Sequence, residues 1–376
     1  MEPPVELAKL STPARRALDP ASPAPMRQMA AKGLLPGLKP AEALTVVALL
    51  AESDAPAIAA AAQGTLDALP EPLLRGALAG DLPPGVLAVV APRYAKHAPL
   101  MERILAHPAI PVAAVALVAE LADEMVSELV AVNERLLLSA PAIIEKLYMN
   151  KATRMSTADR ILELAVRNGV ELPGIPAYKQ AAAAIGQELI AEPSLEPTPD
   201  DVLFKEVDEA ATAAELDPAT EDTHKLDAAT GEEVVDDKFL PLHARLASMT
   251  ITQKIRRAML GTASERLLLV RDTNRLVAEA AIRSPSLQEN EVVRISASRN
   301  VGEEVLRIIA NDREWTRSYQ IKLNLVQNPR TPFTFASKLL PHMRDHELKM
   351  LAKSKNVPGA VSTAARQQLG RRKVEI

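Results

Sequence analysis

Two pairs of side chains between residues 311 and 322 have types and spacings that could bind a ligand. Arg313 and Arg317 are four residues apart, and so are Trp315 and Tyr319. If this segment is one helix, each pair lies on a single face. A basic stripe beside an aromatic one can bind a peptide, a nucleotide base or a phosphate.

The same segment also has a purely structural interpretation. Asn311 is a plausible N-cap with Glu314 at the third helical position, so helix initiation explains part of the pattern. The aromatic pair could pack between helices while the arginines face solvent. If the pattern is functional, the predicted partner-binding residues are Arg313, Trp315, Arg317, Tyr319 and Lys322.

Two histidines, His342 and His346, are four residues apart, the spacing at which two imidazoles on a helix can share a metal ion. The only nearby third ligand is Asp345, and the positive charge of Arg344 opposes a cation. We therefore expect surface histidines here, and we predict no metal site and no cofactor.

Basic residues cluster in three places, and clustered charge attracts polyanions. Without interleaved aromatic residues or a recognised nucleic-acid fold, these clusters could equally form a solvated face or a seat for an acidic part of the same chain. The clusters are Lys254, Arg256 and Arg257; Lys349, Lys353 and Lys355; and Arg366, Arg371, Arg372 and Lys373.

Motifs of known enzyme classes are missing from the sequence. It has no dinucleotide-binding glycine pattern, phosphate-binding loop, zinc-protease motif or nucleophile elbow. The absence of Cys excludes disulfides, thiolate metal sites and Cys nucleophiles. The sequence therefore predicts a protein that is not an enzyme.

The net charge of −4 is distributed unevenly along the chain. Residues 192–238 carry a net charge of −13, whereas residues 239–376 carry a net charge of +12. An acidic segment thus precedes a basic one, and the first could fold back on the second until a partner displaces it.

A short sequence motif, called the turn phrase, recurs along the chain. In each copy an apolar helix ends, a turn contains Pro, and another apolar helix begins. Leu50, Leu78 and Leu105 each open one copy, at spacings of 28 and 27 residues. Proline has no N–H and a fixed φ, so it suits the first turn of a helix. Such a period is typical of stacked helix pairs.

The phrase returns in the C-terminal half of the chain, for example at residues 326–332. When this copy is aligned with residues 105–111, Pro329 matches Pro108 and Pro332 matches Pro111. Only four Phe, four Tyr and one Trp are present, so the core must be aliphatic. These features predict an all-α fold, an α-solenoid of stacked helix pairs in two blocks.

Two segments differ from the repeats in composition. Residues 1–39 are rich in Pro, which predicts a mostly disordered arm. Residues 191–238 are rich in Asp and Glu, which predicts an acidic disordered linker. Within the linker, residues 201–216 could form a short amphipathic helix with Phe204, Val207 and Ala211 on one stripe, and this stripe could dock in a groove. Alternatively, the segment could be a partly helical tether that contacts nothing.

At the level of families, the chain resembles the α-helical repeat proteins of the HEAT, armadillo and leucine-rich-repeat-variant type. The segments LLLVRDTNRLVAEAAIRSP, IANDREWTRSYQIKLNLVQNP and LAKSKNVPGAVSTAARQQL look most like uncharacterised bacterial repeat proteins of the myxobacterial type. The resemblance covers residues 249–370, with a weaker similarity over 130–170. It implies an α-solenoid and transfers no catalytic residue.

Together these patterns predict a disordered arm (1–39), an N-terminal repeat block (40–190), an acidic linker (191–238) and a basic repeat block (239–376). The longest apolar run is too short to span a bilayer, and the first residues do not resemble a signal peptide, so we expect a cytoplasmic location. The expected function is a scaffold or adaptor that binds a protein or peptide. The alternative is binding of nucleic acid or an anionic surface by the basic block.

Overall fold

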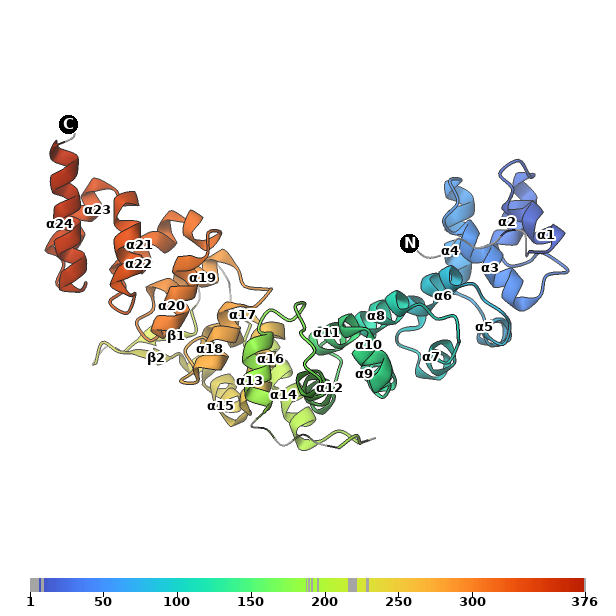
Figure 1. Ribbon diagram of the computed structural model, residues 1–376, viewed down its shortest axis with the longest axis horizontal. Coiled ribbons are helices and arrows are strands. Elements are labelled where there is room, and N and C mark those ends of the chain that lie inside the picture. Colours follow the sequence, from blue (N-terminus) through green and yellow to red (C-terminus); the bar gives the residue numbers. More distant parts are fainter. Residues whose placement is uncertain are drawn as a thin grey trace. The chain divides into compact units, whose positions relative to one another are not determined.

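The computed structural model describes residues 7, 10–186, 188, 190, 192–194, 196–215, 222–227 and 230–374, with the side chains of residues 373 and 374 left out. This part of the chain is mostly helical, with a single two-stranded sheet, which confirms the all-α prediction. The chain divides into two compact units, Met1–Gly174 and Ile175–Ile376. Figure 1 shows the course of the helices within each unit.

The described residues of the first unit form short α-helices and the 3-10 helix η2. They are α1 (Thr12–Leu18), α2 (Ala24–Ala31), α3 (Pro40–Leu50), α4 (Pro56–Asp67), α5 (Glu71–Leu78), α6 (Pro84–Val90), η2 (Ala91–Tyr94), α7 (Ala98–Leu105), α8 (Val112–Leu121), α9 (Glu124–Ala131), α10 (Glu134–Ser139), α11 (Pro141–Met149) and α12 (Met155–Arg167).

The second unit contains the remaining helices and both strands. They are α13 (Tyr178–Ile185), α14 (Pro199–Ala213), β1 (His224–Leu226), β2 (Glu233–Val235), η3 (Asp237–Phe239), α15 (Leu240–Ser248), α16 (Ile251–Leu260), α17 (Ala263–Leu269), α18 (Arg275–Ile282), α19 (Glu289–Ala297), α20 (Glu303–Asn311), η4 (Trp315–Arg317), α21 (Tyr319–Gln327), α22 (Phe333–Leu339), η5 (Leu340–His342), α23 (Asp345–Lys353) and α24 (Gly359–Val374).

Within each unit, helices contact helices two or three further along the chain as well as their neighbours. In the first unit one row of contacts joins α3, α6, α8 and α11, and another joins α5, α7, α9 and α12. In the second unit the rows join α16, α18, α20 and α22, and α15, α17, α19 and α21. The buried residues are mostly Ala, Leu, Val and Ile, so these contacts bury aliphatic faces.

The recurring turn phrase has a specific tertiary role. Helix C-termini leave backbone carbonyls without intrahelical partners. In several copies, the polar residue that precedes the turn Pro lies close to a carbonyl at or near the end of a preceding helix. The pairs are His107 Nε2 with Gly80 O (3.3 Å), Ser284 Oγ donating to Met259 O (3.3 Å), and Asn328 Nδ2 donating to Ser296 O (2.9 Å) and Ser298 O (2.8 Å).

The N-terminal segment differs from the predicted disordered arm. Helices α1 and α2 contact α3, and α2 also contacts α4. Ala14 and Ala17 are fully buried, and the Ser11 backbone N–H donates to the Glu42 carboxylate at 2.5 Å. Closely spaced Pro residues did not prevent helices, because they stand in first turns, where a missing N–H costs nothing. Residues 1–6, 8 and 9 lie outside the described residues.

The segment that was predicted to be a disordered linker contains a helix, α14. Helix α14 begins with a capping box between Thr198 and Asp201. Its residues Phe204, Val207 and Ala211 are 6%, 0% and 0% exposed, which confirms the predicted apolar stripe. This stripe makes the segment part of the second compact unit rather than a separate tether. Residues 191, 195, 216–221, 228 and 229 lie outside the described part.

Candidate functional site

The candidate face at 311–322 is not one helix. Asn311 is the last residue of α20, Trp315–Arg317 forms the 3-10 helix η4, and α21 begins at Tyr319. The prediction of Asn311 as an N-cap and of two parallel stripes is therefore wrong. The physical reason is that Asp312 ends one helix and its side chain accepts a hydrogen bond from the Glu314 N–H at 2.8 Å, which starts a turn.

The residues of this face lie in different environments. Arg313 and Arg317 are exposed, while Trp315 and Lys322 are half-buried. Arg317 forms an ion pair with Glu314 at 2.8 Å, but its side chain is 76% exposed, so this pair contributes little to stability.

Tyr319 has a structural role between α21 and α23. Its hydroxyl donates to the carboxylate of Glu347 and accepts a hydrogen bond from the Arg344 N–H at 2.9 Å. The Arg344 guanidinium lies 4.8 Å from the centre of the Tyr319 ring. Burial, followed by the hydrogen bond to Glu347, raises the pKa of Tyr319. These contacts explain Tyr319 without a ligand.

The histidine pair at 342 and 346 does not form part of a metal-binding group. His342 belongs to η5 and His346 to α23, so they are not on one helix. Across the described residues, no three His, Asp or Glu side chains are grouped so that they could hold a metal ion.

Side chains of α16 and α17 contact the acidic helix α14, and the surface that they form there is called the groove. Phe204 of α14 lies under two guanidinium groups of α16, 5.1 Å from Arg256 and 5.0 Å from Arg257. Asp208, one turn further along α14, accepts a hydrogen bond from Arg257 at 2.8 Å. The carbonyl of Ala214 accepts another from the Ser264 hydroxyl at 3.0 Å. These contacts place α14, which lies in the acidic segment, against α16 and α17 of the basic segment.

Two buried ion pairs join α16 to α17 and α17 to α19. Arg257 binds both oxygens of Glu265, at 2.6 and 2.8 Å, and Arg266 binds Glu291 in the same two-fold manner, at 2.8 and 2.9 Å. Gly261 separates α16 from α17, where an added Cβ would lie 2.5 Å from both the Arg257 carbonyl and the Glu265 carboxylate. The bidentate pair with Glu265 fixes the guanidinium plane of Arg257, which contacts Phe204.

The acidic segment continues into the hairpin of β1 and β2, which is drawn in yellow in Figure 1. The strands are antiparallel, with His224 opposite Val235 and Leu226 opposite Glu233. Gly231 has a φ of 70°. Glycine adopts this backbone conformation far more readily than other residues do.

Glu233 anchors the hairpin to the turn between α19 and α20. Its carboxylate accepts hydrogen bonds from the Ser298 hydroxyl at 2.6 Å and the Arg299 N–H at 3.0 Å, and its carbonyl accepts one from the Asn300 amide at 2.9 Å. Burial alone would raise the pKa of Glu233, but these hydrogen bonds and the charge of Arg271 lower it. The carboxylate is therefore held ionised.

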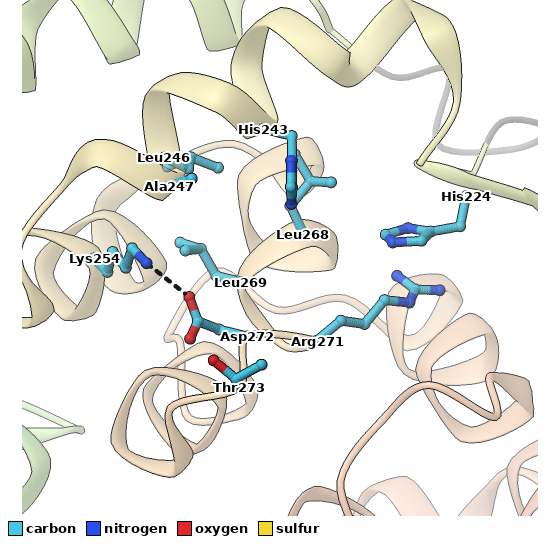
Figure 2. A pocket seen from close by; sticks show the side chains of 10 residues that line it. All are labelled: His224, His243, Leu246, Ala247, Lys254, Leu268, Leu269, Arg271, Asp272 and Thr273. Atoms are coloured by element: carbon cyan, nitrogen blue, oxygen red, sulfur yellow. Dashed lines mark hydrogen bonds and ion pairs between the residues drawn. The ribbon is translucent and has the colours of Figure 1, made fainter. Parts of the chain in front are cut away.

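Between the hairpin and α15–α17 lies a cavity of about 260 Å³. The side chains around it, shown in Figure 2, come from the hairpin, from α15 and α16, and from the end of α17 with the turn that follows. They are His224, His243, Leu246, Ala247, Lys254, Leu268, Leu269, Arg271, Asp272 and Thr273.

The polar groups of the cavity fall into two sets. Lys254 and Asp272 form an ion pair at 3.0 Å on one side. On the other side are Arg271 and the two imidazoles of His224 and His243 (Figure 2). Burial and then the positive charge of Arg271 lower the pKa of His224 to about 4, so its ring is neutral at pH 7.

Sequence reasoning identified only part of this region. Arg256 and Arg257 were recognised as a basic cluster and Phe204 as part of a docking stripe. His224, His243 and Arg271 were missed, because they are far apart in sequence and belong to no known motif. Their only signal was the charge contrast between the two segments.

No protein-family model matches the chain, and comparison with curated proteins found no significant match. The resemblance to HEAT, armadillo and leucine-rich-repeat-variant proteins thus stays a prediction. None of the described helices combines the length and the apolar character needed to cross a membrane.

Proposed function

We propose that this protein is a non-catalytic scaffold or adaptor, an α-solenoid that binds a protein or peptide partner on the surface of its helical repeats. The rows of helix contacts within each unit support the solenoid, because each helix buries its apolar face against the next repeat. The hydrogen bonds from the turn residues to preceding helix ends support repeated stacking. A cytoplasmic location remains part of the proposal.

The observation that carries the proposal is the set of contacts between α14 and α16. The guanidinium groups of Arg256 and Arg257 lie over the Phe204 ring, and the Asp208 carboxylate pairs with Arg257. Aromatic residues and arginines are the groups that dominate binding at protein interfaces. A partner segment with the same chemistry, acidic and aromatic, could take the place of α14.

A peptide-binding experiment tests whether the groove accepts such a segment from outside. The Phe204→Ala/Asp208→Asn double variant weakens the internal segment in the full chain. A fluorescent peptide of residues 196–237 should bind this variant at least about tenfold tighter than the wild-type chain, because the internal segment competes less. A peptide carrying the same two substitutions is the matched control and should bind neither protein.

If the unmodified peptide bound both proteins equally, or neither, the groove would not be a peptide-binding surface. Where it binds as expected, capture from a lysate of the native cell with the double variant and with the wild-type chain identifies the natural partner. The partner should be enriched on the variant.

The alternative is binding of nucleic acid or an anionic surface, and one observation favours it. Lys349, Lys353 and Lys355 in and just after α23, with Arg366 on the adjacent α24, are all exposed. A DNA duplex should then bind the full chain with an affinity that falls steeply as salt rises, and Lys349→Gln/Lys353→Gln/Lys355→Gln should flatten that dependence. No binding at low salt would exclude this alternative.

A further inference from the structure

The cavity behind the hairpin has a cluster of nitrogen atoms that the groove function does not use. Arg271, which is 5% exposed, donates from Nη1 to the Leu267 carbonyl at 2.6 Å and from Nε to the Ser298 hydroxyl at 3.3 Å. Within the described part of the chain, its Nη2 group has no hydrogen-bond acceptor. The nearest carboxylate oxygen paired with Nη2 is that of Asp222, 3.7 Å away.

Two imidazoles lie beside this guanidinium. Nδ1 of His224 is 2.9 Å from the Thr223 hydroxyl. When Nδ1 accepts the hydroxyl proton, the ring proton of His224 lies on Nε2, which faces away from Thr223. Neither Nε2 of His224 nor the ring nitrogens of His243 have a hydrogen-bond partner among the described residues. Figure 2 shows the two rings and the guanidinium directed at the same space.

Two carboxylates lie within 3.9 Å of Arg271 and offset its charge, but neither accepts a hydrogen bond from Nη2. Glu233 lies 3.9 Å from its Nε, but the carboxylate of Glu233 already accepts hydrogen bonds from Ser298 and from the Arg299 N–H. Asp222 is beyond hydrogen-bond distance. Nη2 therefore keeps N–H donors to which an oxygen of a ligand in the cavity can bind.

We propose that this cavity binds a small organic oxyanion, a carboxylate or a phosphate monoester. Its charged group lies against Nη2 of Arg271 and the rings of His224 and His243, and its apolar part contacts Leu246 and Leu268. The volume of about 260 Å³ is below the roughly 300–1,000 Å³ of sites for drug-sized ligands, so the ligand is a small metabolite rather than a polymer.

The position of His224 links this site to the hairpin. His224 belongs to β1, whereas His243 is on α15 and Arg271 follows α17. A ligand that contacts all three joins the hairpin to the helices. If the proposed groove function holds, the ligand also opposes displacement of the acidic segment by a partner, because binding stabilises the docked state. Ligand binding itself does not depend on that function.

Nuclear magnetic resonance of the full chain tests the site directly. The ring signals of its six histidines are followed during titration with phenyl phosphate, with benzoate and, as a neutral control, with benzyl alcohol. One or both anions should shift the His224 and His243 signals with saturation, and should raise the pKa of His224 by placing a negative charge beside it. Benzyl alcohol should not.

A pair of variants makes the test specific. His243→Gln removes one contact from an exposed position and should weaken anion binding by about tenfold, the effect of losing one hydrogen bond to a charged group. His346→Gln, at another exposed histidine of the same unit, should leave it unchanged. Uniform shifts of all histidines, no shifts with either anion, or equal binding by both variants would overturn the proposal.

The same titration separates this site from the groove. If the anions bind as expected but the peptide of residues 196–237 binds neither chain, the ligand site stands and the groove function fails. If the peptide behaves as expected and the anions do not bind, the opposite holds.

Discussion

At the scale of single residues, arginines of the second unit do most of the organising. Arg257 contacts an aromatic ring, an exposed carboxylate and a buried carboxylate at once, which fixes α14 on α16. Arg271 similarly collects contacts from α17, from the turn after α19 and from the hairpin. Arginine suits this role because its planar group offers five donors in a rigid arrangement.

Replacing Phe204 by Ala should destabilise the second unit by about 3 kcal/mol, the usual effect of truncating a buried Phe. The loss combines apolar burial with the cation–π contacts to Arg256 and Arg257. Denaturant unfolding measures it. Val202→Ala on the same helix is the control, since Val202 is 49% exposed and should change stability little. Equal effects of the two substitutions would contradict burial of this helix.

The hairpin should detach as the pH falls, because His224 has a lowered pKa. In the unfolded chain this imidazole binds a proton below about pH 6.5, whereas in the folded chain it does so only near pH 4. Docking is therefore fully stable above pH 6.5 and weakens as the pH falls toward 4. The groups that face the ring are Arg271 and His243, which oppose its protonation, and Asp222 and Glu233, which favour it.

Hydrogen-exchange protection of residues 224–235, corrected for intrinsic rates at each pH, measures this effect. The His224→Gln variant, whose side chain does not titrate, should lose the pH dependence between 6.5 and 4. The same slope in both proteins would show that His224 is not responsible. Glu233 should add a further loss of stability at still lower pH, because its lowered pKa favours docking only while it is ionised.

At the scale of elements, several turns between helices carry a polar residue that contacts a carbonyl at or near the end of a preceding helix. Proline sets the start of the second helix, and the residue before it supplies the hydrogen bond. A turn of this kind therefore carries a tertiary hydrogen bond between helices as well as joining two helices in sequence.

Asn328→Ala should destabilise the second unit by about 1–3 kcal/mol, because two carbonyls, of Ser296 and Ser298, lose their donor in a buried position. Thermal unfolding provides the measurement. Gln327→Ala, one residue earlier and exposed, is the matched control and should have an effect within about 0.5 kcal/mol of zero. A silent Asn328→Ala would mean that water replaces the amide.

At the scale of the whole molecule, the chain forms two compact units divided at Gly174. The prediction placed the end of the first block at residue 190 and a separate linker at 191–238. In the structure, α13 contacts α16 and α18, and α14 contacts α15, so these helices belong to the second unit. Composition suggested an independent acidic segment, but long-range contacts incorporate it.

A core substitution in one unit should leave the other unit intact, because repeat packing transmits stability mainly to neighbours. Ile104→Ala, at a fully buried position of α7, should cost about 2–5 kcal/mol. Hydrogen exchange should show faster opening in α5–α9 and unchanged protection in α20–α24. A uniform loss of protection in both regions would instead indicate a single cooperative structure.

The sequence alone determined the helical class and the starts of several helices, where Pro stands in the first turn. Apolar periodicity and Pro position are local properties, and local properties decide where short helices begin and which face they bury. The apolar stripe of Phe204, Val207 and Ala211 could be predicted from the sequence for this reason. The charge contrast between residues 192–238 and 239–376 was visible in the sequence as well.

Only the tertiary structure decided which side chains meet. It separated Arg313 and Arg317 from a common helix face and assigned Tyr319 to a contact with Glu347. It also brought His224, His243 and Arg271 together around one cavity. Such groupings depend on long-range contacts between elements that are distant in the chain, and no local pattern encodes which elements will be adjacent.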